Sequence, residues 1–314
     1  MPGTRVLRRH DGRVQVGLDP RHAVLLPAGS DAALARLADG GPLDPLLHPL
    51  LDAGLLVARR TVSALVNSVD ESLKPAAAAL VRVHGADAPT AWAARSRAEV
   101  RVVAYGAAGD GLAARAAELL TEAGLSARTD VVGPPSRDGP ALLVGTGQPD
   151  RELVDDWMRG DVPHLVVRMC EGQALVGPFV DPGRSACLRC VDAHHTDVDP
   201  TWPLLVRQHA AAGRRGRSEP ADATAPEPVD PLLATLALAW AARDLTSWVE
   251  GVPPSLLSST LTRRGARRRR GAHLDPTSGL RLQLAGAHRL SRDRPRRAAA
   301  GTGRFRTYLT SHQG

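Results

Sequence analysis

The stretch Val100-Arg101-Val102-Val103-Ala104-Tyr105, followed by Gly106-Ala107-Ala108-Gly109-Asp110-Gly111, decides the fold expected for this chain. Its first half is rich in residues that favour β-structure. The glycines that follow allow a tight turn into a helix over Leu112–Leu120, where the apolar residues share one face. Strand, turn and helix in this order form the unit from which parallel sheets are built.

The same alternation continues downstream of this unit. We expect strands at Ala127–Val132, Ala141–Gly145 and His164–Arg168, with a helix at Arg151–Met158. Repeated crossover connections of this kind place successive strands side by side and parallel. The sequence therefore predicts an α/β domain with a doubly wound sheet.

The glycine turn also raises the question of nucleotide binding. Gly106, Gly109 and Gly111 are spaced G-x-x-G-x-G rather than G-x-G-x-x-G, and Asp110 adds a negative charge where phosphates would lie. Asp130 stands about where a ribose-binding acid is expected. Two interpretations stay open: a turn that only preserves the fold, and a vestigial nucleotide site.

A smaller module precedes this domain. Short β-forming segments at Arg5–Arg9, Arg13–Gly17 and His22–Pro27 are separated by turn residues. Two helices follow, one over Asp31–Leu37 capped by Ser30 and one over Leu43–Leu51 whose leucines recur at helical spacing. Three strands and short helices within some sixty residues predict a winged-helix-like module.

Three roles for this module stay open: a structural cap, a DNA-binding winged helix, and a peptide-binding element. The segment 44–53 contains no Arg or Lys, which argues against phosphate contacts. An exposed strand edge beside an apolar helix can instead take an extended peptide as an added strand. The residues expected at such a peptide site also suit a buried core: Val24, Leu25, Leu26, Leu47, Leu50 and Leu51.

Residues 61–98 form an Ala-rich connector, in which Val62–Val66 is expected to be a strand. Near the other end, Asp230 and Pro231 begin a helix. The helix that starts there has an apolar stripe that is expected to lie in the core, comprising Leu233, Leu236, Trp240, Leu245 and Trp248. The preceding residues, 209–227, are expected to be a surface loop.

Charge is distributed unevenly along the 314 residues. The whole chain has a net charge of +7, but the segment from Arg263 onward holds 14 Arg against Asp275 and Asp293, a net +12. We expect this tail, residues 263–314, to be a disordered basic segment, through which alone nucleic acid would bind. With no apolar signal segment at the start and no apolar run long enough to span a bilayer, we expect a cytoplasmic protein without membrane contact.

The most distinctive stretch is Gly177-Pro178-Phe179-Val180-Asp181-Pro182-Gly183-Arg184-Ser185-Ala186-Cys187-Leu188-Arg189-Cys190. Here, and in Asp199-Pro200-Thr201-Trp202-Pro203, the chain resembles the ThiF-type, ubiquitin-activating-like superfamily. More narrowly, it resembles the cyclodehydratase partner proteins of azole-forming RiPP (TOMM) biosynthesis. The N-terminal module and the helix that starts at Asp230 support this resemblance, which spans most of residues 5–262.

The resemblance implies a domain plan and a function. Residues 1–60 would be a PqqD-like peptide-recognition element, 61–98 a connector and 99–262 a degenerate ThiF-like, Rossmann-type domain. The chain would be a non-catalytic subunit that binds the leader of a ribosomal precursor peptide and presents it to a YcaO-type, ATP-dependent cyclodehydratase for thiazoline or oxazoline formation. The alternative is an ATP-dependent adenylyltransferase acting on a sulfur carrier or a peptide C-terminus. A homodimer is also open.

The resemblance further implies a structural zinc held by two Cys-x-x-Cys pairs. Cys187 and Cys190 form one such pair, but the second pair is missing from the sequence. Cys170 is a poor substitute, while His194 and His195 follow at short range. An incomplete zinc site and a pair of free thiols therefore both stay open, and no cofactor is firmly implied.

Overall fold

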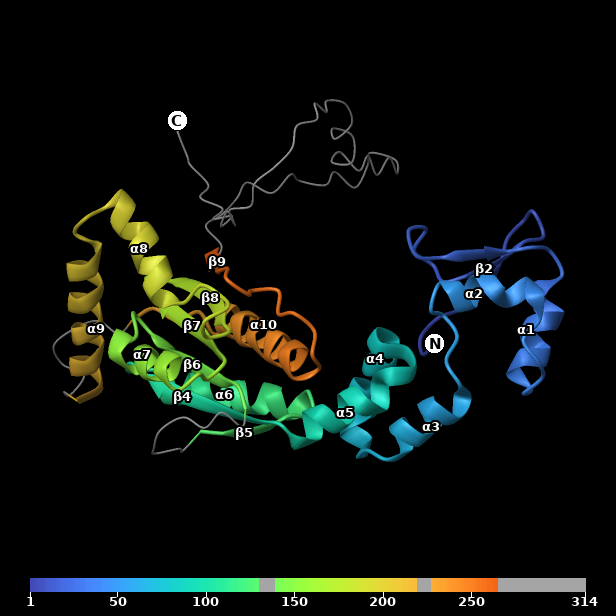
Figure 1. The fold of residues 1–314 in the computed structure, drawn as a ribbon, viewed down its shortest axis with the longest axis horizontal. Coiled ribbons are helices and arrows are strands. Elements are labelled where there is room, and N and C mark those ends of the chain that lie inside the picture. The colour runs from blue at the N-terminus through green and yellow to red at the C-terminus, as the bar shows by residue number, and fades with distance from the viewer. Residues whose placement is uncertain (130–138, 219–226, 265–314) are drawn as a thin grey trace, which may run out of the picture.

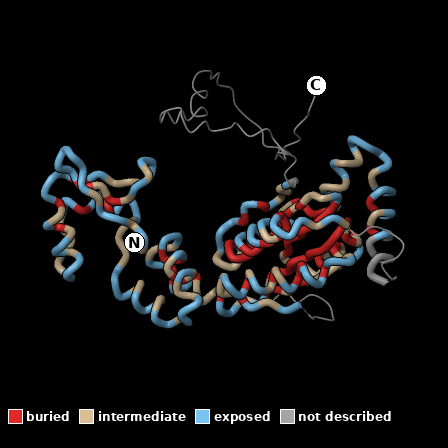
Figure 2. Tube along the Cα trace, turned by 180° about the vertical axis from the view of Figure 1, so that it is seen from behind, coloured by how far each residue is buried: buried red, intermediate tan, exposed pale blue. Residues whose placement is uncertain are grey.

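The computed structural model describes residues 1–129, 139–218 and 227–264. Along the chain, an N-terminal module, a helical connector and a larger sheet domain follow one another (Figure 1). Buried residues gather mainly in the sheet domain, with smaller groups in the module and the connector (Figure 2). The expected Asp130 lies outside the described residues, as does the expected tail from residue 265 onward.

The N-terminal module contains the three predicted strands, β1 (Val6–Arg8), β2 (Val14–Val16) and β3 (Val24–Leu26), in one antiparallel sheet of order β1-β2-β3. Two helices, α1 (Ser30–Ala38) and α2 (His48–Asp52), and a 3-10 turn, η1 (Pro45–Leu47), complete it. The apolar face of the sheet is covered by leucines of these helices, which gives the module its own small core.

Two details of the module differ from expectation. Ser30 is the first residue of α1 rather than its cap, and its hydroxyl donates to the Pro27 carbonyl (2.8 Å). The second expected helix begins as η1 and continues as α2, because Pro49 has no N–H to donate to a preceding helical turn.

The connector is helical throughout, with α3 (Arg59–Asn67), α4 (Lys74–His84) and α5 (Ala88–Arg97) joined by the 3-10 turns η2 (Glu71–Leu73) and η3 (Gly85–Asp87). The strand predicted at Val62–Val66 is wrong. Val62, Leu65 and Val66 recur at the spacing of one helix face, and that face packs into the connector core. Burial of this face outweighs the β-preference of valine.

The larger domain has a six-stranded sheet of order β5-β4-β6-β7-β8-β9. Strands β4 (Glu99–Tyr105), β5 (Ser126–Arg128), β6 (Ala141–Thr146) and β7 (His164–Cys170) are parallel, whereas β8 (Gln173–Val180) and β9 (Leu261–Arg264) are antiparallel to their neighbours. The predicted parallel α/β fold is confirmed. The two antiparallel strands at one side were not predicted.

Helices cover both faces of this sheet. On one face, α6 (Gly109–Glu122) and α10 (Pro231–Val249) pack on the sheet and share the largest core. On the other, α7 (Arg151–Arg159) covers the strands, joined by Leu188 at the start of α8 (Leu188–Val198). The remaining helix, α9 (Trp202–Ser218), pairs with α8 beyond the end of the sheet (Figure 1).

Three sequence predictions for this domain need correction. The segment from residue 209 to 218 belongs to helix α9 rather than to a surface loop. Strand β9 pairs with β8 and carries the sheet to Arg264, beyond the boundary expected at residue 262. The stripe of α10 is not all core: Leu236 and Trp240 keep 69% and 43% of their surface exposed.

None of the helices in the described ranges is both long and apolar enough to cross a bilayer.

Candidate functional site

The backbone pairing of the N-terminal sheet shows which way each strand presents its hydrogen-bonding groups. The Arg9 N–H donates to the Arg13 carbonyl (3.0 Å), and the Gly17 N–H donates to the Arg5 carbonyl (2.9 Å). Because residues of an antiparallel strand alternate between its two sides, Gln15 also directs its backbone groups toward β1.

The same alternation fixes the orientation of β3. Val14 and Val16 must face away from β1, so they bond with their partners on β3, Leu26 and Val24. Leu25 lies between these two and therefore turns its N–H and C=O away from β2. In the described part of the chain β3 has no other strand partner, so this edge is open to an added extended strand.

The six residues expected at the peptide site differ in how far they are buried. Three have side chains buried in the core of the module, which leaves no surface for a ligand: Leu26, Leu47 and Leu50. Val24 is half-buried and packs against that core. Two remain accessible, with 44% and 52% of their surface exposed: Leu25 and Leu51. Since α2 contacts β3, the open strand edge lies beside an apolar helix, as the peptide-binding interpretation requires.

The glycine turn after β4 is built for tight packing. Gly106 has φ +71°, and a Cβ at this position would lie 2.5 Å from the Thr146 carbonyl oxygen on β6. Gly109 and Asp110 are the first residues of α6, and Gly111 borders open space. Gly106 thus has a structural reason to be glycine, whereas Asp110 places a carboxylate at the helix end where a phosphate would bind.

A buried ionic cluster, missed by the sequence analysis, joins three helices near the carboxyl ends of the parallel strands. Arg151 of α7 donates to both carboxylate oxygens of Asp192 on α8 (Nε–Oδ2 2.7 Å and Nη2–Oδ1 2.9 Å). Trp202 of α9 donates its indole N–H to the same carboxylate (3.0 Å). Burial alone would raise the pKa of Asp192, but these hydrogen bonds and the Arg151 charge outweigh it and lower the pKa.

A second buried arginine lies on β7. Arg168 is 3% exposed, and its long hydrogen bonds reach the Gln148 side chain (3.3 Å) and the Gly177 carbonyl (3.4 Å). Its Nε has no hydrogen-bond partner among the described residues. Burial lowers the pKa of Arg168. A charged residue ending an apolar β-run was the one sequence signal that could have indicated this position.

Helix α9 lies against this end of the sheet. The ring of His209 is so close to Gly147 that a Cβ there would lie 3.0 Å from the His209 Cε1 atom. His209 Nε2 is also 3.5 Å from Cys170 Sγ. Burial raises the pKa of Cys170 to about 11, so this cysteine–histidine contact leaves the thiol protonated and does not make it an activated nucleophile.

The Cys-x-x-Cys pair lies at the start of α8. The sulfur atoms of Cys187 and Cys190 are 3.8 Å apart. Within the described ranges, no group of three or more His, Cys, Asp or Glu residues is arranged to hold a metal ion. His195 stacks on Trp202, with ring centroids 4.3 Å apart, rather than joining the thiols. Two sulfur ligands cannot close the tetrahedron that structural zinc requires, so the described residues do not fit this metal.

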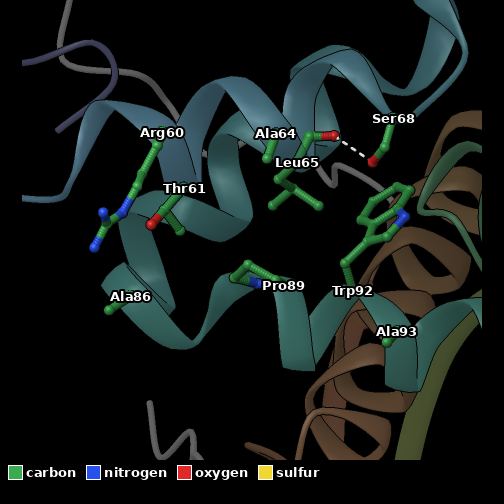
Figure 3. Close-up of a pocket in the computed structure, with 9 residues that line it drawn as sticks. All are labelled: Arg60, Thr61, Ala64, Leu65, Ser68, Ala86, Pro89, Trp92 and Ala93. Atoms are coloured by element: carbon green, nitrogen blue, oxygen red, sulfur yellow. Dashed lines mark hydrogen bonds between the residues drawn. The ribbon is translucent and has the colours of Figure 1, made fainter.

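An open pocket with mostly apolar walls lies in the connector between α3 and α5 (Figure 3). Two hydroxyl side chains line it, those of Thr61 and Ser68, and Ser68 Oγ donates to the Leu65 carbonyl (2.8 Å). The pocket is lined by Arg60, Thr61, Ala64, Leu65, Ser68, Ala86, Pro89, Trp92 and Ala93. This chemistry suits packing in the connector rather than catalysis.

The described residues form an N-terminal three-stranded module attached through a helical connector to a Rossmann-like α/β domain. No protein-family model and no curated protein sequence matches the chain. Solved structures do resemble it. A heterocyclase in complex with substrate and cofactor superposes with a TM-score of 0.58 at 18% identity, covering 83% of this chain and 36% of the heterocyclase.

Two further structures resemble the chain. The heterocyclase TruD has a TM-score of 0.56 at 14% identity and covers 83% of this chain and 39% of its own length. E. coli MccB, solved with MccA, has a TM-score of 0.53 at 12% identity and covers 84% of this chain and 92% of its own. The chain thus has the fold shared by heterocyclases and MccB, and spans little more than a third of the heterocyclase chains.

Proposed function

We propose that the chain is a scaffold subunit that binds the leader of a ribosomal precursor peptide and presents the peptide to a separate YcaO-type cyclodehydratase. The observation that carries this proposal is the open edge of β3, where Leu25 directs its backbone N–H and C=O outward. An extended peptide paired along this edge would gain main-chain hydrogen bonds, and the exposed Leu25 and Leu51 would supply apolar contacts.

The similar proteins support a role in peptide maturation. One similar structure is a heterocyclase with substrate bound, and another holds MccB with MccA. This chain aligns with 36% and 39% of the two heterocyclases, so each of them contains further segments that the alignment does not cover. We assign the role of those segments to the YcaO-type partner. That partner would use ATP to activate a backbone amide, which a Cys, Ser or Thr side chain then attacks with net loss of one water.

We propose that this partner docks on α10. Its outer side carries Leu232, Leu236 and Trp240, each exposed and spaced four residues apart. There is no charged side chain on this helix before Arg243. A surface helix that is apolar on its outer side as well as its inner side is expected to be covered by another protein. We assign this face to the cyclodehydratase, which would be tethered to the same chain that holds the precursor.

Binding of a fluorescein-labelled synthetic leader tests the first half of the proposal. Leaders of precursor genes beside this chain's gene should raise fluorescence anisotropy in a saturable way, with micromolar affinity, and a scrambled leader should not. If no neighbouring leader binds, the scaffold role is wrong.

The alternative of peptide adenylation is tested separately. Pyrophosphate exchange into ATP should stay at background when the purified chain is mixed with Mg²⁺ and each precursor. Exchange by the chain alone would replace the scaffold proposal with adenylation. Supplying the purified cyclodehydratase should instead produce precursor molecules lighter by one water per ring formed.

A further inference from the structure

Cys187 and Cys190 share the first turn of α8. Cys187 is the N-terminal cap residue, in an extended conformation with φ −100° and ψ −179°, and Cys190 is the third residue of the helix. Their sulfur atoms are 3.8 Å apart. A disulfide bond is about 2.05 Å long, so the two sulfurs, which are carried by one turn of backbone, must approach each other before they can bond.

The two thiols differ in their access to solvent. Cys190 is exposed, whereas Cys187 keeps only 8% of its surface. The exposed thiol is therefore the one that a reagent in solution meets first, and the buried thiol is placed to react with whatever forms on its neighbour.

Among the residues that the structure describes, these sulfurs lack the further ligands that a structural zinc site needs. No third metal-ligating residue joins them within the described part of the chain. The third cysteine, Cys170, lies at the end of β7, where it contacts His209 instead. The chain has three cysteines in all, so Cys187 and Cys190 are the two whose sulfur atoms lie next to each other.

We propose that Cys187 and Cys190 form a reversible dithiol–disulfide site that exchanges electrons with a low-molecular-weight disulfide. With glutathione disulfide, the Cys190 thiolate attacks one sulfur, the glutathione S–S bond breaks and one glutathione thiolate leaves. Cys187 then loses its proton and attacks the mixed disulfide on Cys190, which releases the second glutathione. Two electrons pass from the protein to glutathione disulfide, and two glutathione thiols and one protein disulfide result.

Oxidation should leave the fold intact. The neighbouring residues that attach α8 to α7 are held by their own ion pairs, Arg189 with Asp155 (2.6 Å) and Asp192 with Arg151 (2.7 Å). Neither pair includes a sulfur atom. A disulfide in the first turn therefore closes without removing these contacts, so both redox states should keep the same helix content.

The test equilibrates the full chain with glutathione and glutathione disulfide in graded ratios. Acid-quenched samples are unfolded, alkylated and weighed by mass spectrometry. We expect three alkylated cysteines under reducing conditions and one under oxidising conditions, with a single two-electron transition between them and an unchanged far-ultraviolet circular dichroism spectrum. Peptide mapping should place the remaining alkyl group on Cys170.

Three variants make the assignment specific. Cys170→Ser should keep the transition, because it leaves the pair intact. Cys187→Ser should stop at a stable glutathione adduct on Cys190, while Cys190→Ser should react much more slowly. Adducts that accumulate on Cys190 in the unaltered chain without loss of the second thiol would overturn the proposal. So would stoichiometric zinc that blocks oxidation and is released only by a chelator. Neither result bears on leader binding.

Discussion

Glu250, at the end of α10, shares its buried carboxylate between two helices of the connector. Arg95 of α5 donates its Nε to Oε1 (2.7 Å), and His84 at the end of α4 lies 2.6 Å from Oε2. Arg95 also donates to the Ala123 carbonyl after α6 (2.8 Å). The carboxylate is 1% exposed, so the connector is attached to the sheet domain by a desolvated ionic contact rather than by a surface ion pair.

Replacing this carboxylate should loosen that attachment. Glu250→Ala leaves the Arg95 guanidinium buried without its counter-charge, and we expect a loss of about 3 kcal/mol in the free energy of unfolding, measured with urea. Glu118→Ala removes an exposed partner of Arg115 and should cost less than about 1 kcal/mol. Equal losses of unfolding free energy in the two variants would mean that the buried contact stabilises the protein no more than an exposed ion pair does.

The peptide-binding proposal predicts opposite results at the two edges of the N-terminal sheet. Leu25→Pro removes an outward N–H from the open edge of β3 without removing a bond to β2, so leader affinity should fall at least tenfold while the module stays folded. Val6→Pro is the matched control, because the same alternation turns the Val6 N–H outward at the β1 edge. Anisotropy titration of both variants measures their affinity for the leader. A larger loss of affinity in Val6→Pro than in Leu25→Pro would place the peptide site on β1.

Docking of the cyclodehydratase should depend on the outer face of α10. Leu236→Ser together with Trp240→Ser should weaken the complex at least tenfold in light-scattering or interferometry measurements with the purified partner. Leu205→Ser alters a leucine of similar exposure on α9 and should leave the complex unchanged. A second copy of the chain is the other occupant this face could accept. A dimer that dissociates in the double variant, with partner binding intact, would assign the face to self-association.

Much of the sheet domain was predictable because its signals are local. The apolar runs of β4, β6 and β7 and the helices between them follow one another in a regular order, and buried parallel strands have this appearance in sequence. The N-terminal strands were likewise marked by turn residues. These elements need only their own residues and immediate neighbours to be identified.

The missed elements are stabilised by distant partners. Strand β9 has the sequence Leu261-Thr262-Arg263-Arg264, which has no apolar alternation and is a strand only because β8 lies beside it. The buried cluster joins Arg151 to Asp192, which is 41 residues further along the chain. The orientation of Leu25 depends on the pairing of β1 with β2. No local pattern carries such information. The sequence therefore predicted which segments form the candidate site, but not which of their side chains and backbone groups are exposed.

Substitutions in the glycine turn test whether Gly106 is needed for packing or is only a remnant of a nucleotide-binding site. Gly106→Ala would force a side chain into a positive-φ position and against the Thr146 backbone, and we expect a loss of about 2 kcal/mol or more. Gly111→Ala lies on the open side of α6 and should stabilise the protein by about 0.5 kcal/mol. Urea unfolding measures both. A neutral Gly106→Ala variant would remove the structural reason for this glycine.

His164 should make the stability of the chain depend on pH. Its ring is fully buried on β7, with Nδ1 2.8 Å from the Val162 carbonyl, and burial lowers its pKa to about 4. Between pH 6.5 and 4, His164 therefore binds a proton in the unfolded chain but not in the folded chain. The free energy of unfolding falls as the pH is lowered through this range. The full effect is about 3 kcal/mol and levels off below pH 4.

Comparing variants isolates this contribution from that of the carboxylates. His164→Asn should lose stability at pH 7 but show a smaller further loss between pH 7 and pH 4.5 than the unaltered chain, whereas His10→Asn, at an exposed position, should keep the original pH dependence. Urea midpoints followed by tryptophan fluorescence provide the measurement, since Trp157 lies against the His164 ring with centroids 5.3 Å apart. An identical pH dependence in His164→Asn would show that His164 is protonated equally in the folded and unfolded chains, and its burial would then have no energetic consequence in acid.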